Sequence, residues 1–272
     1  MEARLQRRVQ RYGWDRAADD YERLWQSQLS EAQAALLARA APRAGDRVLD
    51  VASGTGLVAL AAANAVGASG RVVGVDISGE MVVAARRRAA ELGVVNAEFA
   101  RMDAEALELA DATFDVALCA LGLMYVPDAA RAIRELRRVV RPGGRIGILV
   151  WGERSRCGWS TVFPIVQDEV TSDVCPLFFR LGSGDALARE CRDAGFVAVE
   201  QHRISTPLEY DDGAAACDAA FVGGPVALAW AHFDAATRAR VRARYLESIA
   251  PWRAGRGYRV PGEFVVVVAA RA

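Results

Sequence analysis

Short apolar runs alternate with longer amphipathic stretches along much of this chain. Residues 2–40 carry aromatic and aliphatic side chains at helical spacing, which predicts one or two amphipathic helices. From residue 46 onwards, apolar runs predict strands, most of them separated by helical stretches: "RVLDVA", "RVVGVDIS", "NAEFARM", "FDVALCA" and "GRIGILVWG". This alternation is typical of a doubly wound α/β fold, in which a mainly parallel sheet is covered on both faces.

The stretch "DAARAIRELRRVVR" shows how helix boundaries are predicted here. Asp128 is placed to cap the N-terminus, and Pro142-Gly143-Gly144 ends the helical pattern. Beyond residue 152 we expect helices at 160–170 and 184–194, and strands at 197–206 and over the last ten residues. Residues 211–256, between those two strands, predict a mostly helical insertion.

Composition narrows the class of partner. Of the 272 residues 53% are hydrophobic, and Lys+Arg and Asp+Glu both total 34, so the formal net charge is zero. A neutral balance argues against nucleic acid or an anionic membrane surface as the main partner. We therefore expect a globular protein that acts on a small molecule, as a monomer or a homodimer.

The cysteines and the first residues bear on the compartment. Five cysteines are scattered without C-x-x-C spacing, and we interpret them as reduced thiols rather than a disulfide framework or a zinc site: Cys119, Cys157, Cys175, Cys191 and Cys217. The start "MEARLQRRVQ" is too polar for a secretory signal, and no apolar run is long enough to span a bilayer. These features predict a cytoplasmic protein with no metal site.

The stretch "VLDVASGTG", residues 48–56, raises the question of a nucleotide cofactor. Gly54, Gly56 and Ala59 fit the dinucleotide fingerprint G-x-G-x-x-G/A, so a nicotinamide-dependent (NAD(P)) oxidoreductase is one candidate. Asp50, at the end of the strand, would suit a ligand with an ammonium group better than a phosphate. Asp76 ends the next strand and can accept hydrogen bonds from two ribose hydroxyls. Together these acids favour a ligand with a ribose at one end and a cation at the other.

Five blocks in this order resemble the class I S-adenosylmethionine-dependent methyltransferases, and within them the ubiquinone/menaquinone and small-molecule methyltransferases. The blocks are "VLDVASGTG", "VVGVDIS", "RMDAEAL", "FDVALCALGLMYVPD" and "RVVRPGG", and they cover roughly residues 40–152. The resemblance implies a Rossmann-like seven-stranded sheet with a helical lid inserted before the last strand. It also suggests a division into an N-terminal helical segment (1–40), a cofactor-binding domain (41–207), an acceptor-binding insertion (208–261) and the last strand (262–272).

The resemblance also implies a cofactor site for S-adenosylmethionine. Asp50 and the residues of the glycine turn would surround the methionine moiety, although the family often has glycine at position 52. Asp76 would hold the ribose, while Asp103 would accept from the adenine amino group. The remaining implied residues are Ala52, Ser53, Gly54 and Gly56 in the turn, Ile77, Met81 and Ala104 beside the adenine, and Cys119, Ala120 and Leu121 below the methyl group. For Ile77 and Met81 a place in the core is an equal alternative, and Cys119 fits a buried apolar role better than a nucleophilic one.

Aromatic residues in the N-terminal and inserted segments, with 152–182, suggest a flat, apolar acceptor such as a phenol, a quinone or a heteroaromatic ring. Packing of the lid onto the sheet is the alternative explanation for any one of them. The candidate acceptor-binding residues are Tyr12, Trp14, Tyr21, Trp25, Tyr125, Trp151, Trp230 and His232. We expect methyl transfer to O, N or C to depend mainly on positioning, with His232 or Tyr125 as the only candidate bases. A cofactor-binding but inactive partner protein is a third alternative.

Overall fold

The computed structural model describes residues 3–170 and 178–272, and a single mixed sheet forms its centre. Within these residues the strand order is β3-β2-β1-β4-β5-β8-β6, and the two-residue β7 pairs with β8 at the side. The bounds are β1 Arg47–Val51, β2 Arg71–Asp76, β3 Ala97–Arg101, β4 Phe114–Ala120, β5 Val140–Trp151, β6 Phe196–Tyr210, β7 Arg253–Ala254 and β8 Gly257–Arg271. Strands β1 to β5 pair in parallel, and β8 runs antiparallel to both β5 and β6. The predicted doubly wound, mainly parallel α/β fold is confirmed.

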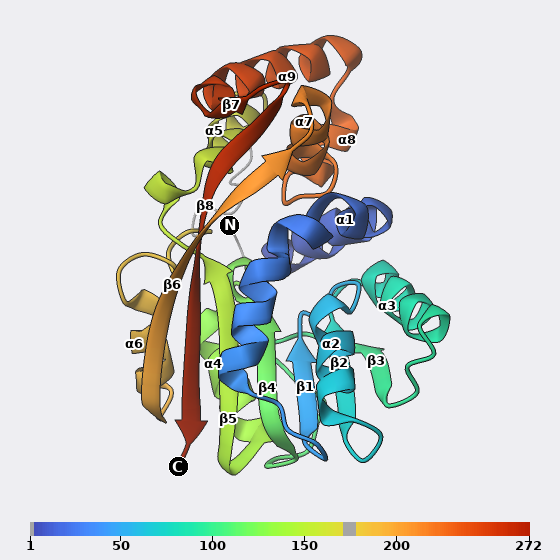
Figure 1. Ribbon diagram of the computed structural model, residues 1–272, viewed down its shortest axis with the longest axis vertical. Coiled ribbons are helices and arrows are strands. Elements are labelled where there is room, and N and C mark those ends of the chain that lie inside the picture. Colours follow the sequence, from blue (N-terminus) through green and yellow to red (C-terminus); the bar gives the residue numbers. More distant parts are fainter. Residues whose placement is uncertain (1–2, 171–177) are drawn as a thin grey trace.

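Helices cover the sheet and form a separate group beyond its upper end (Figure 1). Their bounds are α1 Ala3–Ala40, α2 Leu57–Val66, α3 Gly79–Glu91, α4 Ala129–Val139, α5 Val162–Gln167, α6 Ala186–Asp193, α7 Gly213–Phe221, α8 Ala227–His232 and α9 Ala235–Ile249. Short 3-10 turns occupy Leu123–Tyr125, Arg154–Arg156, Gly158–Thr161 and Ala250–Trp252. The Asp128 side chain accepts a hydrogen bond from the Arg131 N–H at 2.9 Å, so this predicted helix cap is confirmed.

Helix α1 is one continuous helix of 38 residues that crosses a face of the sheet (Figure 1). From Ala17 onwards it contributes buried side chains to the core, including Leu29 and Leu36. On β5, a side chain at Gly147 would come within 2.9 Å of Leu36 and Ala40, so glycine lets the helix approach the sheet closely. Residues 4–16 have no fully buried side chain, and this first part of α1 instead lies over the carboxyl ends of the strands.

Strands β6 and β8 are longer than the sequence pattern predicts and carry the helices α7 to α9 (Figure 1). For β6 the sequence predicts a strand that ends at residue 206, whereas in the structure its pairing with β8 continues to Tyr210 opposite Tyr258. The sequence pattern did not predict this extension, because it contains prolines, which are usually excluded from strand interiors. Here Pro207 and Pro261 are register partners, so the two positions without an N–H face each other.

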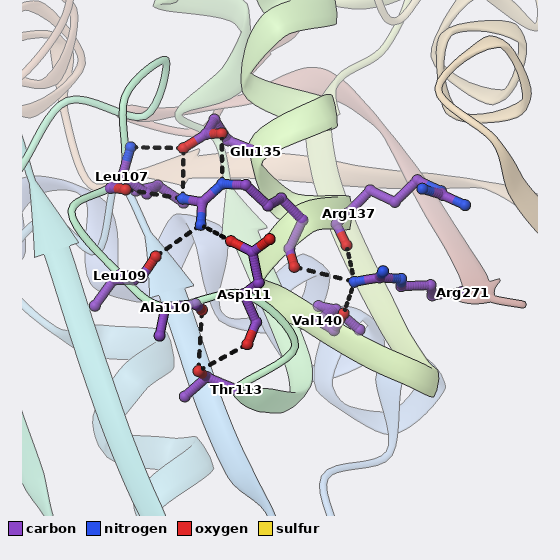
Figure 2. A network of polar contacts seen from close by, with 10 residues as sticks. Leu107, Leu109, Ala110, Asp111, Thr113, Glu135, Arg137, Val140 and Arg271 are labelled. Atoms are coloured by element: carbon purple, nitrogen blue, oxygen red, sulfur yellow. Dashed lines mark hydrogen bonds and ion pairs between the residues drawn. The ribbon is translucent and has the colours of Figure 1, made fainter.

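The loop after β3 is held in place by an arginine of α4 (Figure 2). Arg138 donates to the carbonyl oxygens of Leu107 at 2.8 Å and Leu109 at 2.7 Å. Its guanidinium also pairs with the carboxylates of Glu135 and Asp111, at 2.8 and 2.6 Å. Glu135 in turn accepts from the Leu107 N–H at 2.8 Å, and its pKa is lowered mainly by Arg138. This network fixes the end of a loop whose beginning contributes to the candidate site.

Candidate functional site

The turn after β1 combines a left-handed backbone with close packing underneath. Ala52, Gly54 and Gly56 all have positive φ, at 57°, 54° and 85°. A side chain on Gly56 would come within 3.1 Å of the Phe99 ring, whereas one on Gly54 would meet nothing within 4 Å. A side chain at position 56 would thus be crowded by Phe99 and strained by the left-handed backbone, whereas position 54 borders open space.

Asp76, at the end of β2, organises this turn from the neighbouring strand. Its two carboxylate oxygens accept from the backbone N–H groups of Gly54 and Ser78, both at 2.9 Å. Burial raises the pKa of Asp76 to about 6; the charge of Asp15 acts in the same direction, and the backbone hydrogen bonds oppose it. Asp15 comes from α1 and accepts from the Ser78 hydroxyl at 2.6 Å. The N-terminal helix is thus joined directly to the β2 end of the site.

A cavity lies above the glycine turn, at the carboxyl ends of β1, β2 and β4. It encloses about 760 Å³ of empty space, part of it open to solvent, which is within the usual range of small-molecule sites. The resemblance-based cofactor residues on its wall are Ala52, Gly54, Asp76, Ile77, Met81, Asp103, Ala104, Ala120 and Leu121. The fold therefore brings together most of the positions that sequence reasoning selected.

Four predicted cofactor residues, Asp50, Ser53, Gly56 and Cys119, do not line this cavity. Asp50 is 1% exposed, and among the described residues neither of its carboxylate oxygens has a hydrogen-bond partner. The hydroxyls of Ser53 and Thr55 are also buried without a partner, so polar atoms gather within the turn. Burial raises the pKa of Asp50 to about 8 and that of the Cys119 thiol to about 12. A thiol with such a pKa is a poor nucleophile at neutral pH.

Sequence reasoning missed cavity residues that come from α1 and from the loops after β3 and β4. Arg7 of α1 pairs with the Asp103 carboxylate at 3.1 Å and with Glu105, which is almost fully buried. The pKa of Arg7 is raised, chiefly by its hydrogen bond to Glu105. The other residues missed are Gln10, Met102, Gly122, Val126 and Pro127. Arg7 and Gln10 carry no local signal, since each is a polar residue in an ordinary helical stretch.

A second, smaller cavity adjoins the first and is walled by aromatic rings. We call it the aromatic chamber. It shares Trp14, Tyr21, Leu121 and Tyr125 with the first cavity. Its further walls are Trp25, Leu29, Met124, Trp151, Trp159 and residues 223–225 between α7 and α8. The rings pack edge to face or tilted, with centroids 5.1 Å apart for Trp14 and Tyr125 and 4.8 Å for Trp151 and Trp159. Five predicted acceptor-binding residues, Trp14, Tyr21, Trp25, Tyr125 and Trp151, thus lie together.

Three predicted acceptor-binding residues line neither cavity: Tyr12, Trp230 and His232. Tyr12 is 47% exposed. The Trp230 ring stacks on Phe221 at 4.9 Å, inside the group formed by α7 to α9. His232 is exposed, and its Nδ1 lies 2.7 Å from the Leu228 carbonyl oxygen. Cys175 and part of the 152–182 segment lie outside the described residues.

The helices and the acidic, histidine and cysteine side chains bear on membrane and metal binding. In residues 3–170 and 178–272 no helix is both long and apolar enough to cross a bilayer. The same part of the chain has no group of three or more His, Cys, Asp or Glu residues arranged to hold a metal ion.

Comparison with known proteins identifies the family. The profile of a family described as a methyltransferase domain matches residues 48–144. The ubiquinone/menaquinone biosynthesis C-methyltransferase of Pseudomonas fluorescens is 39% identical over 185 residues, which covers 61% of this chain and 71% of that protein. The chain belongs to the class I S-adenosylmethionine-dependent methyltransferases. The same enzyme of Klebsiella pneumoniae is 31% identical over 61% of this methyltransferase and 72% of its own length.

A solved structure shows that the methyltransferase shares its fold. The YcgJ protein from Bacillus subtilis superposes with a TM-score of 0.64 at 19% identity, over 89% of this chain and 98% of that one. The protein is therefore a Rossmann-like methyltransferase whose cofactor is S-adenosylmethionine. This identification confirms the enzyme class predicted from the five sequence blocks and replaces the alternative of a nicotinamide-dependent oxidoreductase.

Proposed function

We propose that this methyltransferase acts on a small, flat, aromatic or heteroaromatic metabolite. The observation that carries the proposal is the aromatic chamber, which shares a wall with the larger cavity. Rings such as those of Trp14 and Tyr125 provide large apolar surfaces that suit a planar acceptor. The acceptor would lie in the chamber, while the cofactor would occupy the larger cavity.

The residues on the wall of the larger cavity fit S-adenosylmethionine, which supplies a methyl group already activated by the positive sulfonium. Asp76 offers a carboxylate for the ribose hydroxyls, and Ile77 and Met81 offer apolar surface for the adenine. Asp103 would accept from the adenine amino group beside the Ala104 N–H. The carboxyl group of Asp50, in β1 just before the turn, is the group that would attract the ammonium of the methionine moiety. A cation beside a carboxyl group lowers its pKa, so Asp50 would release its proton when the cofactor binds.

Catalysis in this proposal depends on positioning. Walls of packed rings exclude water and hold the acceptor in line with the methyl group, which lowers the barrier without a strong base. Of the two candidate bases, only Tyr125 lines the cavities, and His232 is on the outer surface of the helical group. A proton released by the acceptor would therefore leave through solvent or through Tyr125.

C-methylation of a quinone precursor ring is a second candidate. It is favoured by the similar proteins, which are ubiquinone/menaquinone biosynthesis C-methyltransferases.

The division into an N-terminal segment, a cofactor domain and an acceptor-binding insertion belongs to the proposal too. So do a cytoplasmic location and a monomeric or homodimeric state.

Calorimetric titration with S-adenosylhomocysteine tests the cofactor half. Asp76→Ala should weaken binding by about ten- to a hundredfold, because a charge-assisted hydrogen bond is lost. Asp193→Ala, at an exposed position of α6, is the matched control and should bind like the wild type. Equal affinity in both variants would remove Asp76 from the cofactor site.

A panel of phenols, quinols and aliphatic alcohols and amines, assayed by mass spectrometry for an added methyl group, tests the acceptor half. Methylated aromatic products support the proposal, and turnover restricted to aliphatic compounds contradicts it. Ring-carbon methylation of a quinol would select the second candidate.

A further inference from the structure

The larger cavity and the aromatic chamber share a wall of four side chains: Trp14, Tyr21, Leu121 and Tyr125. With the cofactor in the larger cavity and the acceptor in the chamber, the methyl group has to be transferred at this wall. The positively charged sulfur that carries the methyl group then lies against the same side chains. None of the described residues that line both cavities is acidic, so no carboxylate on the shared wall balances this charge.

Three of these four side chains are aromatic, and we call Trp14, Tyr21 and Tyr125 the aromatic junction. Trp14 and Tyr21 come from α1, whereas Tyr125 ends the 3-10 turn after β4. The Trp14 ring stands at 84° to that of Tyr21 and at 81° to that of Tyr125, with centroids 5.6 and 5.1 Å apart. Trp14 and Tyr21 also keep part of their surface accessible. Several rings on one cavity wall, set nearly at right angles, resemble the aromatic cages that bind methylated ammonium groups.

An aromatic ring can take the place of a carboxylate beside a cation. Its face is negative and attracts a cation within about 6 Å of the ring centroid, most strongly for tryptophan. Burial raises the pKa of Tyr21, and the charge of Asp76 acts in the same direction, so the hydroxyl keeps its proton at neutral pH. Tyr21 thus meets a cation with its ring and not with a negative oxygen. Asp76 lines the larger cavity but not the chamber, and its two oxygens already accept from the N–H groups of Gly54 and Ser78.

We propose that the aromatic junction is a cation site that positions the sulfonium of S-adenosylmethionine and distinguishes it from the neutral product. This inference rests on the proposed function, because an acceptor in the chamber brings the methyl group to the junction. As the electron pair of the acceptor forms a bond to the methyl carbon, the carbon–sulfur bond breaks and its electron pair stays on sulfur, while the acceptor gives up a proton to solvent. The junction then faces a neutral thioether, so the rings that hold the methyl donor hold S-adenosylhomocysteine less tightly.

Calorimetric titration of the full-length protein with S-adenosylmethionine and with S-adenosylhomocysteine measures the preference for the charged ligand, as the ratio of the two dissociation constants. Trp14→Leu and Tyr21→Leu keep an apolar side chain and remove the ring, so each should lower this preference by about three- to thirtyfold. Tyr21→Phe and Tyr125→Phe keep the ring face and should stay within about twofold of the wild type. Tyr12→Leu, on the same helix but lining neither cavity, is the matched control and should leave the preference unchanged.

Two further measurements separate the charge from the methyl group. An analogue of S-adenosylmethionine in which C–H replaces the sulfonium keeps the methyl group and is neutral at that position. The wild type should bind it more weakly than S-adenosylmethionine by about three- to thirtyfold, and Trp14→Leu should reduce this difference. Fluorination weakens the negative face of an indole with little change of shape, and of the six tryptophans only Trp14 lines the larger cavity. Protein that contains difluorotryptophan should therefore bind S-adenosylmethionine more weakly and S-adenosylhomocysteine as before.

A preference that stays within about twofold of the wild type in both leucine variants would overturn the proposal and leave the cation to the carboxylates of the site. So would equal wild-type affinity for S-adenosylmethionine and its neutral analogue, or an equal fall in the phenylalanine variants, which would assign the effect to the hydroxyl groups. If a leucine variant does not fold, the fluorinated protein decides, because an unchanged preference there contradicts the contact with Trp14. All of these measurements are made at equilibrium without an acceptor. A failure to methylate any aromatic compound would thus contradict the proposed function separately from the cation site.

Discussion

The buried carboxyl group of Asp50 makes a prediction about stability and pH that needs no ligand. Asp50 is 1% exposed, and neither of its oxygens has a hydrogen-bond partner in the part of the chain that the structure describes. Burial raises its pKa from 3.8 to about 8; the nearby charge of Asp76 acts in the same direction, and the backbone N–H of Ala59 opposes it. At neutral pH the folded, cofactor-free protein therefore holds a proton on Asp50 that the unfolded chain releases. Replacement by asparagine keeps the shape of the side chain and removes the titration.

The sign and size of the effect follow from proton linkage. Since the folded-state pKa is raised, folding is most favourable below the unfolded pKa and becomes less favourable as pH rises towards the folded pKa. One pH unit within this window changes the free energy of unfolding by about 1.4 kcal/mol. From about pH 4 to pH 7 the wild type should thus lose about 4 kcal/mol through Asp50 alone. Asp76 titrates in both proteins, so the difference between them isolates Asp50.

Urea unfolding of the cofactor-free protein, followed by tryptophan fluorescence at several pH values, measures this difference. The advantage of Asp50→Asn over the wild type should grow from about pH 4 to pH 8 and then level off. Asp193→Asn, at an exposed position, should follow the wild type throughout. A difference between Asp50→Asn and the wild type that is constant with pH would refute the reasoning. It would mean that the carboxylate is already charged and stabilised inside the fold.

Three further predictions concern packing, the loop network and catalysis. Gly122→Ala should lower the free energy of unfolding by about 1 to 3 kcal/mol in urea titrations, because the new methyl group overlaps that of Ala52. The second substitution Ala52→Gly in the same chain should restore most of this stability, and a failure to do so would mean that the clash lies elsewhere. Arg138→Met should cost about 2 kcal/mol in the same assay by breaking the contacts of its guanidinium with Leu107, Leu109, Asp111 and Glu135 (Figure 2). Arg87→Met, at an exposed ion pair, should cost under about 0.5 kcal/mol. His232→Ala should lower kcat by less than the roughly hundredfold typical of a lost general base; a larger fall, with acceptor and cofactor affinities unchanged, would make His232 catalytic.

Sequence reasoning was most successful where structure is encoded locally. The alternation of strand and helix patterns predicted the parallel part of the sheet, and the cap at Asp128 is where the pattern placed it. The turn after β1 and Asp76 were found for the same reason, because both lie at the carboxyl end of a strand, where ligands bind in an open α/β sheet, and the glycines permit the left-handed backbone of the turn. Such signals lie within a few residues of one another, so they survive without knowledge of the tertiary fold.

Contacts between distant segments could not be found in this way. Arg7 and Asp15 lie far along the chain from their partners Asp103 and Ser78, and only the path of α1 across the site brings them together. For the aromatic residues the error was the opposite one: some residues that were predicted to bind the acceptor lie away from both cavities. Trp230 has the composition of a ligand-binding residue, yet its ring stacks on Phe221 within the helical group. An aromatic side chain is expected to be buried, but its residue type does not tell whether the ring lines a ligand cavity or packs among helices.

Ala52 shows why a departure from a family pattern must be considered together with its spatial neighbours. Alanine at this position has a left-handed backbone, at φ 57°, which costs an L-residue about 1 to 2 kcal/mol relative to glycine. Its methyl group occupies the space that a side chain at Gly122 would need. Both residues line the larger cavity, and the wall has room for one methyl group there, which Ala52 supplies and Gly122 leaves out. The family often has glycine at position 52 of the turn. Here the glycine is at position 122 instead, in the loop after β4, and only the structure shows that the two positions are neighbours.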